Sequence, residues 1–176
     1  LVNALCSAAG VDASRIHIEL VGPTEANTTR GQKVGAEAGI PVKCVSALPH
    51  SDAIRLMATP AVLLVVQPRN FSVQIPTKIY EYLRTGNPVL VLADEDSAVW
   101  QLASRFQRCR RLDFDDVARN RVVLSDLFQQ WTTGGLEQVR TDLDTESFDK
   151  LVVGREFVAL VRDLLNEGSS SASTDV

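Results

Sequence analysis

Hydrophobic positions along this chain alternate between short continuous runs and stripes at helical spacing. Apolar runs of strand length separated by amphipathic helical segments are typical of βα units in a mostly parallel sheet. Four of the runs are rich in Val, Ile and Leu, as strands buried on both faces are. The exception, 15–21, alternates, and we expect it to show one face to a less covered region. The predicted strands are 15–21, 42–46, 61–67, 89–93 and 109–114.

The helical stripes predict helices between these strands and after the last one. Ser51, Ser97 and Asp115 are the expected N-cap residues, because their short side chains can accept from the free amides of a first turn. We therefore expect an α/β fold, a Rossmann-like three-layer α/β/α sandwich with a mostly parallel sheet of about five or six strands and two long C-terminal helices. The predicted helices are 2–9, 28–38, 51–59, 76–85, 97–106, 116–131 and 146–167.

Length and composition favour one domain. The 176 residues are 45% hydrophobic and 23% charged, which is enough for one well-buried core. We expect that domain to span residues 1–167, followed by a flexible Ser-rich tail over 168–176 that has nothing to bury. The first residue is Leu1, and the segment after it resembles the end of a helix that leads directly into a strand. We therefore expect the chain to be a fragment of a longer protein.

Charge and cysteine content exclude several classes of function. The net charge is −4 and no dense basic run occurs, so a nucleic-acid partner is not expected. No apolar run approaches 18 residues, and no membrane span is expected. The cysteines Cys6, Cys44 and Cys109 are scattered singly, without the spacing of a disulfide framework or a zinc site. These features favour a cytoplasmic location.

The segment that begins at Pro76 has the features of a short, sharply bounded helix with an anion-binding first turn. Proline is favoured at a first helical position, Gly86 supplies a C-cap, and Pro88 prevents continuation. Free amides at the start of a helix attract anions, and Lys78 adds a positive charge. The residues predicted to bind a phosphate or diphosphate are Pro76, Thr77, Lys78 and Ile79.

This segment, with the strand before it, resembles the donor-binding C-terminal domain of GT-B fold glycosyltransferases of the retaining, glycogen-synthase-like type. In that family a strand and a short loop precede a helix that bears a glutamate, and a small residue, Gly and Pro follow. Here 61–67 is the strand, Glu81 the glutamate, and Gly86 with Pro88 the end of the motif. The resemblance implies that Glu81 accepts hydrogen bonds from the ribose of a nucleotide sugar.

Weaker similarities lie earlier in the chain. Gly22 ends a strand as in the family, and the segment 42–48 resembles the strand and loop that pass the nucleotide base. His50 lies beyond the carboxyl end of a strand, where open α/β sheets bind ligands. We expect possible base or phosphate contacts from Gly22, Ala47, Leu48 and His50.

Two departures from the family leave the expected site incomplete. Val73 stands where many members carry a further acid. The family's basic pair for the diphosphate, and the acceptor-binding domain, would precede Leu1. The resemblance thus implies half of an enzyme that transfers a sugar from a nucleotide donor of unknown base, with no separate cofactor. We expect this chain alone to be inactive, and no residue in it is identified as catalytic. The full-length protein could be peripheral to a membrane.

Other interpretations remain open. A sugar-nucleotide epimerase has the same architecture, and a non-catalytic Rossmann-like module would contribute only protein contacts. The acids at 94–96, and Asp113, Asp115 and Asp116, are interpreted as helix-capping residues rather than metal ligands. We expect no metal site.

Overall fold

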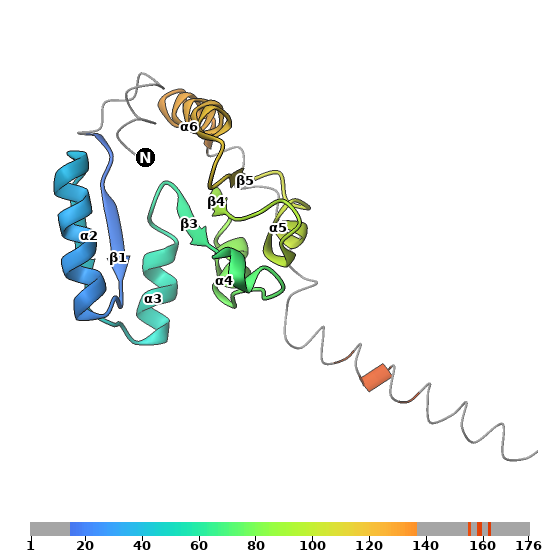
Figure 1. Ribbon diagram of the computed structural model, residues 1–176. Helices are drawn as coiled ribbons and strands as arrows, with labels where there is room; N and C mark the ends of the chain where they lie inside the picture. Colours follow the sequence, from blue (N-terminus) through green and yellow to red (C-terminus); the bar gives the residue numbers. More distant parts are fainter. Residues whose placement is uncertain (1–14, 137–154, 156–157, 160–161, 163–176) are drawn as a thin grey trace, which may run out of the picture. The chain divides into compact units, whose positions relative to one another are not determined.

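The computed structural model describes residues 15–136, together with Arg155, Val158, Ala159 and Arg162. These four are helical, within the range predicted for the last helix; the rest of that range, the predicted helix 2–9 and the tail 168–176 lie outside the described residues (Figure 1). The chain divides into two compact units, 1–142 and 143–176, and the elements below belong to the first.

Strands and helices alternate along the first unit, which confirms the α/β class and the parallel direction of the strands. All five predicted strands are present, and one short 3-10 helix, η2, was not predicted. The elements are β1 (Ile18–Val21), α2 (Glu25–Ala38), β2 (Val42–Val45), α3 (His50–Met57), β3 (Leu63–Val66), η2 (Arg69–Phe71), α4 (Lys78–Thr85), β4 (Val89–Leu92), α5 (Ala98–Ala103), β5 (Cys109–Leu112) and α6 (Val117–Thr132).

The prediction of one sheet of five or six strands is wrong for the described residues. β1 pairs only with β2, with Ile18 opposite Val42, and β3, β4 and β5 form a separate sheet in that order. In the second sheet Leu63 lies opposite Val89, which lies opposite Cys109. Apolar patterning fixes the number and direction of strands, but it does not determine which edges meet.

The core of the three-stranded sheet lies on one of its faces. Alternate strand residues are buried there, and α4, which contacts β3, contributes the fully buried Ile79 and Leu83. Val99 and Ala103 of α5 are also fully buried. On the opposite face of β3, Leu64 is 50% exposed and Val66 is 49% exposed. The expectation that this apolar strand is buried on both faces is therefore wrong.

Glycine allows α2 to approach the two-stranded sheet, which it accompanies in Figure 1. A Cβ added at Gly35 would lie 2.8 Å from the carbonyl oxygen of Ile40 and closer still to the side chain of Val42. At Gly31 the nearest atom would be the terminal methyl Cδ1 of Leu20, at 2.9 Å. The buried Ile40 and the partly buried Ile18 pack together beside this contact.

Helix starts differ from the predictions by one to three residues, and the largest difference is at α2, which begins at Glu25 instead of residue 28. The Ser97 hydroxyl caps α5 by accepting from the Trp100 amide at 3.4 Å, as predicted. The cap of α6 is Asp116 rather than Asp115, and it accepts from the Arg119 amide at 2.8 Å. Ser51 is not a cap, because α3 already begins at His50 and follows Pro49, which offers no side-chain acceptor.

Candidate functional site

The candidate site lies around the start of α4. Because α4 follows β3 after a loop, its first turn lies toward the carboxyl ends of the strands, where open α/β sheets bind ligands. The Ile79 amide donates to the Pro76 carbonyl at 3.0 Å, and the Tyr80 amide donates to the Thr77 carbonyl at 3.2 Å. The backbone therefore turns from Pro76 onward, although the α-helix itself begins at Lys78.

The four predicted diphosphate-binding residues differ in whether their backbone amides are free to meet a ligand. The side chain of Ile79 is fully buried and its amide is engaged with Pro76. Thr77 and Lys78 are exposed, and their amides make no backbone hydrogen bond to another described residue. Of the four, Thr77 and Lys78 thus carry the amides that can face an anion at the positive end of the helix dipole.

Two predicted residues from different helices come together here. His50, the first residue of α3, places its Nδ1 4.0 Å from Oε1 of Glu81 in the first turn of α4. The Glu81 side chain is 32% exposed and that of His50 is 79% exposed. Both groups are therefore reachable by a ligand and close enough to share one.

The two helices are also joined at their other ends, which fixes the spacing between His50 and Glu81. Asn87, buried just after α4, donates from Nδ2 to the Met57 carbonyl at the end of α3, at 2.9 Å. Gly86 adopts a left-handed conformation with φ 74°, which confirms it as the C-cap of α4. Beside Glu81, burial and then the Glu81 charge raise the pKa of Tyr82, so its phenol stays neutral near pH 7.

Gly22 and Ala47 lie together at the carboxyl ends of β1 and β2. The Gly22 amide donates to the Val45 carbonyl at 2.9 Å. A Cβ at Gly22 would be 3.7 Å from the Cα of Ala47. Among the contacts between described residues, none joins Gly22, Ala47 or Leu48 to Glu81, so of the predicted base contacts only His50 meets the α4 residues.

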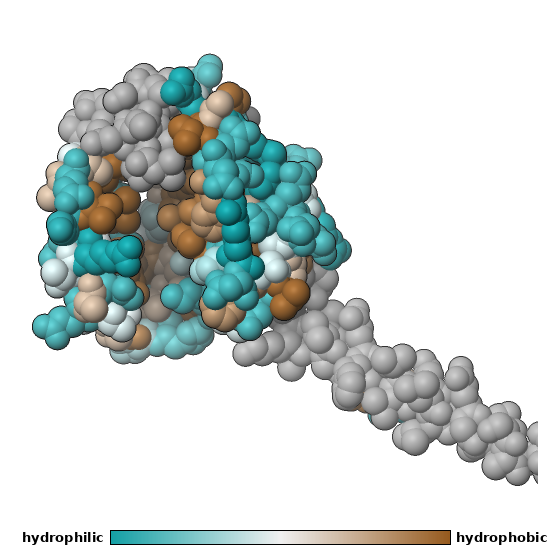
Figure 2. Space-filling model, in the orientation of Figure 1, coloured by the Kyte–Doolittle hydropathy of each residue, from teal (hydrophilic) through white to brown (hydrophobic). Residues whose placement is uncertain are grey.

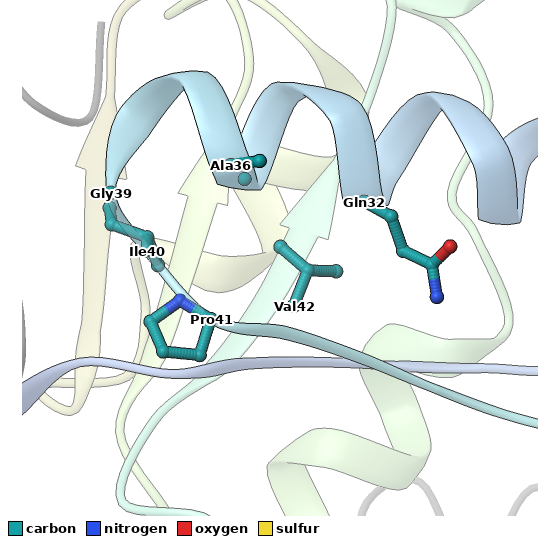
Figure 3. Close-up of a pocket in the computed structure, with 7 residues that line it drawn as sticks. Gln32, Ala36, Gly39, Ile40, Pro41 and Val42 are labelled. Carbon is teal, nitrogen blue, oxygen red and sulfur yellow. The ribbon is translucent and has the colours of Figure 1, made fainter.

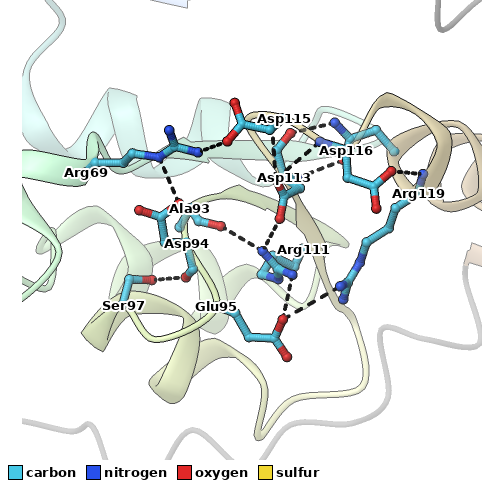
Figure 4. Close-up of polar contacts among 11 residues, drawn as sticks. Arg69, Ala93, Asp94, Glu95, Ser97, Arg111, Asp113, Asp115, Asp116 and Arg119 are labelled. Atoms are coloured by element: carbon cyan, nitrogen blue, oxygen red, sulfur yellow. Dashed lines mark hydrogen bonds and ion pairs between the residues drawn. The ribbon is translucent and has the colours of Figure 1, made fainter.

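A network of arginines and carboxylates at the same edge of the three-stranded sheet was not predicted (Figure 4). Its centre is Arg111 of β5, whose side chain is only 2% exposed. The guanidinium donates to the Ala93 carbonyl at 3.2 Å, to Asp113 Oδ2 at 2.8 Å and to Glu95 Oε2 at 2.9 Å. The Asp115 amide, and then Arg111, hold the pKa of Asp113 below its usual range.

A second arginine extends the network across three loops. Arg69, after β3, donates from Nε to Asp94 Oδ1 at 3.0 Å and pairs with Asp115, while its guanidinium carbon lies 5.2 Å from the centre of the Phe114 ring. The loops after β3, β4 and β5 are thereby tied together. Within the described residues, no three His, Cys, Asp or Glu side chains are grouped to hold a metal ion.

The sequence offered one signal for this network that the capping interpretation missed. Arg111 lies two residues after the apolar Cys109, so the two share the inward face of β5, and a buried guanidinium requires acidic partners. Asp113 does serve a turn, since its Oδ1 accepts from the Asp115 amide at 2.9 Å. Asp94 and Glu95, however, pair with arginines instead of capping α5.

An apolar groove lies elsewhere, between the end of α2 and the start of β2 (Figure 3). It is lined by Gln32, Gly35, Ala36, Gly39, Ile40, Pro41 and Val42. Gln32 supplies its only polar side chain, and the groove is at the amino end of β2, opposite the edge where parallel sheets bind ligands. We therefore do not consider it a candidate site.

Comparison with models of known protein families finds no match, and comparison with curated protein sequences finds no significant similarity. No helix in the described part of the chain combines the length and hydrophobicity required to cross a membrane.

Proposed function

We propose that this chain is the nucleotide-sugar-binding half of a GT-B type glycosyltransferase. The motif from Pro76 to Pro88 supports this proposal, because it forms a capped helix after a parallel strand, as the resemblance implies. The observation that carries the proposal is the 4.0 Å approach of His50 to Glu81. Because of this approach, an exposed imidazole and a carboxylate lie close together at the edge where α/β units bind ligands.

In this proposal each group has a separate role in holding the donor. The Glu81 carboxylate accepts hydrogen bonds from two ribose hydroxyls, and charge-assisted bonds of this kind are about twice as strong as neutral ones. The amides of Thr77 and Lys78 face the diphosphate. Because they are fixed in position, they stabilise the charge that grows on the leaving diphosphate without rearranging.

His50 lies where it can contact the same nucleotide, through its base or a phosphate. The acceptor sugar or other acceptor is held by a part of the enzyme outside this chain. On this proposal the chain alone binds a nucleotide sugar weakly and does not turn it over.

The first prediction is that Glu81→Gln weakens nucleotide binding. We expect the dissociation constant for the preferred nucleoside diphosphate to rise between about 10-fold and 100-fold, because a ribose hydroxyl loses a charged acceptor. Amide chemical-shift titration with nucleoside diphosphates of different base, and with their sugar esters, measures it. The expected shifts lie at 76–82 and at His50.

Glu37→Gln, an exposed carboxylate on α2, is the matched control and should bind like the unaltered protein. If no nucleotide shifts the amides at 76–82, or if Glu37→Gln and Glu81→Gln weaken binding equally, the proposal is wrong.

A further inference from the structure

Two asparagines in the described part of the chain are almost completely buried, each with 1% exposure, but their side chains are bonded differently. Asn120 on α6 uses both of its polar atoms: Nδ2 donates to the Asp113 carbonyl and Oδ1 accepts from the Asp113 amide, each at 2.7 Å. Asn87, between α4 and β4, donates from Nδ2 to the Met57 carbonyl at 2.9 Å. Its Oδ1 has no hydrogen-bond partner among the described residues.

The unpaired Oδ1 of Asn87 is unfavourable for folding. A buried acceptor without a partner costs more free energy than a single hydrogen bond usually returns. An apolar side chain of similar shape would remove both the bond to Met57 and this cost. Asn87 is therefore not explained by stability, in contrast with Asn120, and a half-satisfied buried group of this kind requires another explanation.

The element that Asn87 holds is α3. None of the 8 residues of this helix is buried, and no side chain caps its start. Most of the stability of a protein helix comes from packing of a buried face, and α3 has little of this. The bond from Asn87 reaches the carbonyl of Met57, the last residue of α3. The position of α3 therefore depends strongly on how its ends are held.

The other end of α3 carries His50. The surface at the lower edge of the molecule, where Figure 1 places the start of α3, is mostly hydrophilic (Figure 2). The His50 side chain is 79% exposed, and its Nδ1 lies 4.0 Å from Oε1 of Glu81. Because the helix is about 10 Å long, a tilt of about 10° at Met57 would move His50 by about 2 Å. His50 can thus meet a ligand of Glu81 only while the Met57 end stays in place.

We propose that Asn87 is a positioning residue of the candidate site. Its Nδ2 holds Met57, and with it α3, so that His50 reaches the ligand that Glu81 binds. Asn87 lies beyond the end of α4 and touches no ligand itself. The inference rests on the proposed nucleotide site, to which it adds a buried residue that controls binding from a distance.

The variants Asn87→Leu and Asn120→Leu should have opposite effects on stability and on binding. Asn87→Leu removes one hydrogen bond together with the unpaired Oδ1, whereas Asn120→Leu leaves both backbone groups of Asp113 unpaired. We expect Asn120→Leu to lower the urea midpoint of unfolding more. We expect Asn87→Leu to raise the dissociation constant of the best-bound of ADP, GDP and UDP about 10-fold, and Asn120→Leu to change it less than about 2-fold. If both variants raise it equally, the inference is wrong.

A double-mutant cycle with His50→Ala separates positioning from general loosening. We expect His50→Ala to weaken nucleotide binding in the unaltered protein and in Asn120→Leu. In Asn87→Leu, where His50 is already displaced, it should weaken binding by less than about 2-fold. The same factor in all three proteins would show that His50 and Asn87 act independently, which overturns the inference. Asn87→Ala, which also lacks the donor, replaces Asn87→Leu if the larger side chain does not fit.

Hydrogen exchange without nucleotide distinguishes failure of this inference from failure of the proposed function. We expect the amides at 52–57 to exchange at least about 10-fold faster in Asn87→Leu than in Asn120→Leu, because α3 opens locally once Met57 is released. Equal rates would show that Asn87 does not hold α3, and the inference would be wrong whatever the nucleotide result. If the rates differ as expected but the unaltered protein binds no nucleotide, the proposed function is wrong and the role of Asn87 in holding α3 stands.

Discussion

At the scale of single residues, the Cys109 thiol is an example of reactivity removed by burial. It lies in β5, where burial raises its pKa to about 12 although Arg108 and Arg110 oppose the shift. The thiolate is the form that reacts with alkylating reagents. We predict that iodoacetamide at pH 8 modifies the half-buried Cys44 and leaves Cys109 unmodified in the folded protein, as measured by peptide mass spectrometry.

The same reagent applied in guanidinium chloride should modify both residues, which provides the control. Equal modification of Cys44 and Cys109 in the folded protein would contradict this account of burial.

A second single residue, Asp113, makes the free energy of unfolding depend on pH. The pKa of its carboxyl is lowered in the folded state by the Asp115 amide and by Arg111. A lowered pKa contributes stability that is present above the unfolded value, about 3.9, and is lost as the pH falls through the lower folded value. We therefore predict that the free energy of unfolding decreases below about pH 4 and that Asp113→Asn reduces this decrease.

Urea denaturation between pH 3 and pH 7 measures this effect. Asp96→Asn is the control, because Asp96 is exposed and its only described hydrogen bond uses its carbonyl. An acid dependence that is identical in Asp113→Asn and Asp96→Asn would exclude the proposed contribution.

At the scale of elements, the contact of α2 with β2 depends on the absence of one side chain. Alanine at Gly35 would meet the Ile40 carbonyl and Val42, and overpacking of this kind costs about 1–3 kcal/mol. Alanine also favours a helix by about 1 kcal/mol relative to glycine. We predict a net loss of about 1–2 kcal/mol in the free energy of unfolding for Gly35→Ala, measured by urea denaturation.

Gly31→Ala is the matched comparison on the same helix. Its nearest obstacle is the end of the flexible Leu20 side chain, which can rotate away. The free energy of unfolding should be unchanged or raised by up to about 1 kcal/mol. If both variants lose stability equally, close packing at Gly35 is not the cause.

The sequence was a good guide to elements because their signals are local. Strand runs such as Val89–Leu92, the cap at Ser97 and the C-cap at Gly86 depend on neighbouring residues alone. The start of α6 was displaced by one residue because Asp113, Asp115 and Asp116 are all suitable N-caps. Only the local backbone decides among them.

At the scale of the whole molecule, prediction from sequence reached the class of fold but not the pairing of strands. Nothing in the sequences of β1 and β3 says whether the two strands are neighbours, since each pattern specifies only a strand that lies in a parallel sheet. For the candidate site, the sequence predicted Glu81 as a ribose ligand and His50 as a base or phosphate contact for separate reasons. The structure brings the two side chains to within 4.0 Å of each other. Their distance depends on the packing of α3 on α4, which no local pattern encodes.

The arginine network was missed for a related reason. Asp94 and Asp115 stand next to helix starts, and local reasoning assigns them to caps. Their pairing with Arg69 spans three loops and exists only once β3, β4 and β5 lie side by side. Long-range ion pairs of this kind follow from the fold and cannot be found before it.

The free edge of β3 has a practical consequence. An apolar edge strand is a template to which a strand of another molecule can add. β3 lies at the edge of the described three-stranded sheet and reads Leu-Leu-Val-Val, without the charged residues or proline that protect natural edges. We therefore expect this chain to associate edge to edge in concentrated solution.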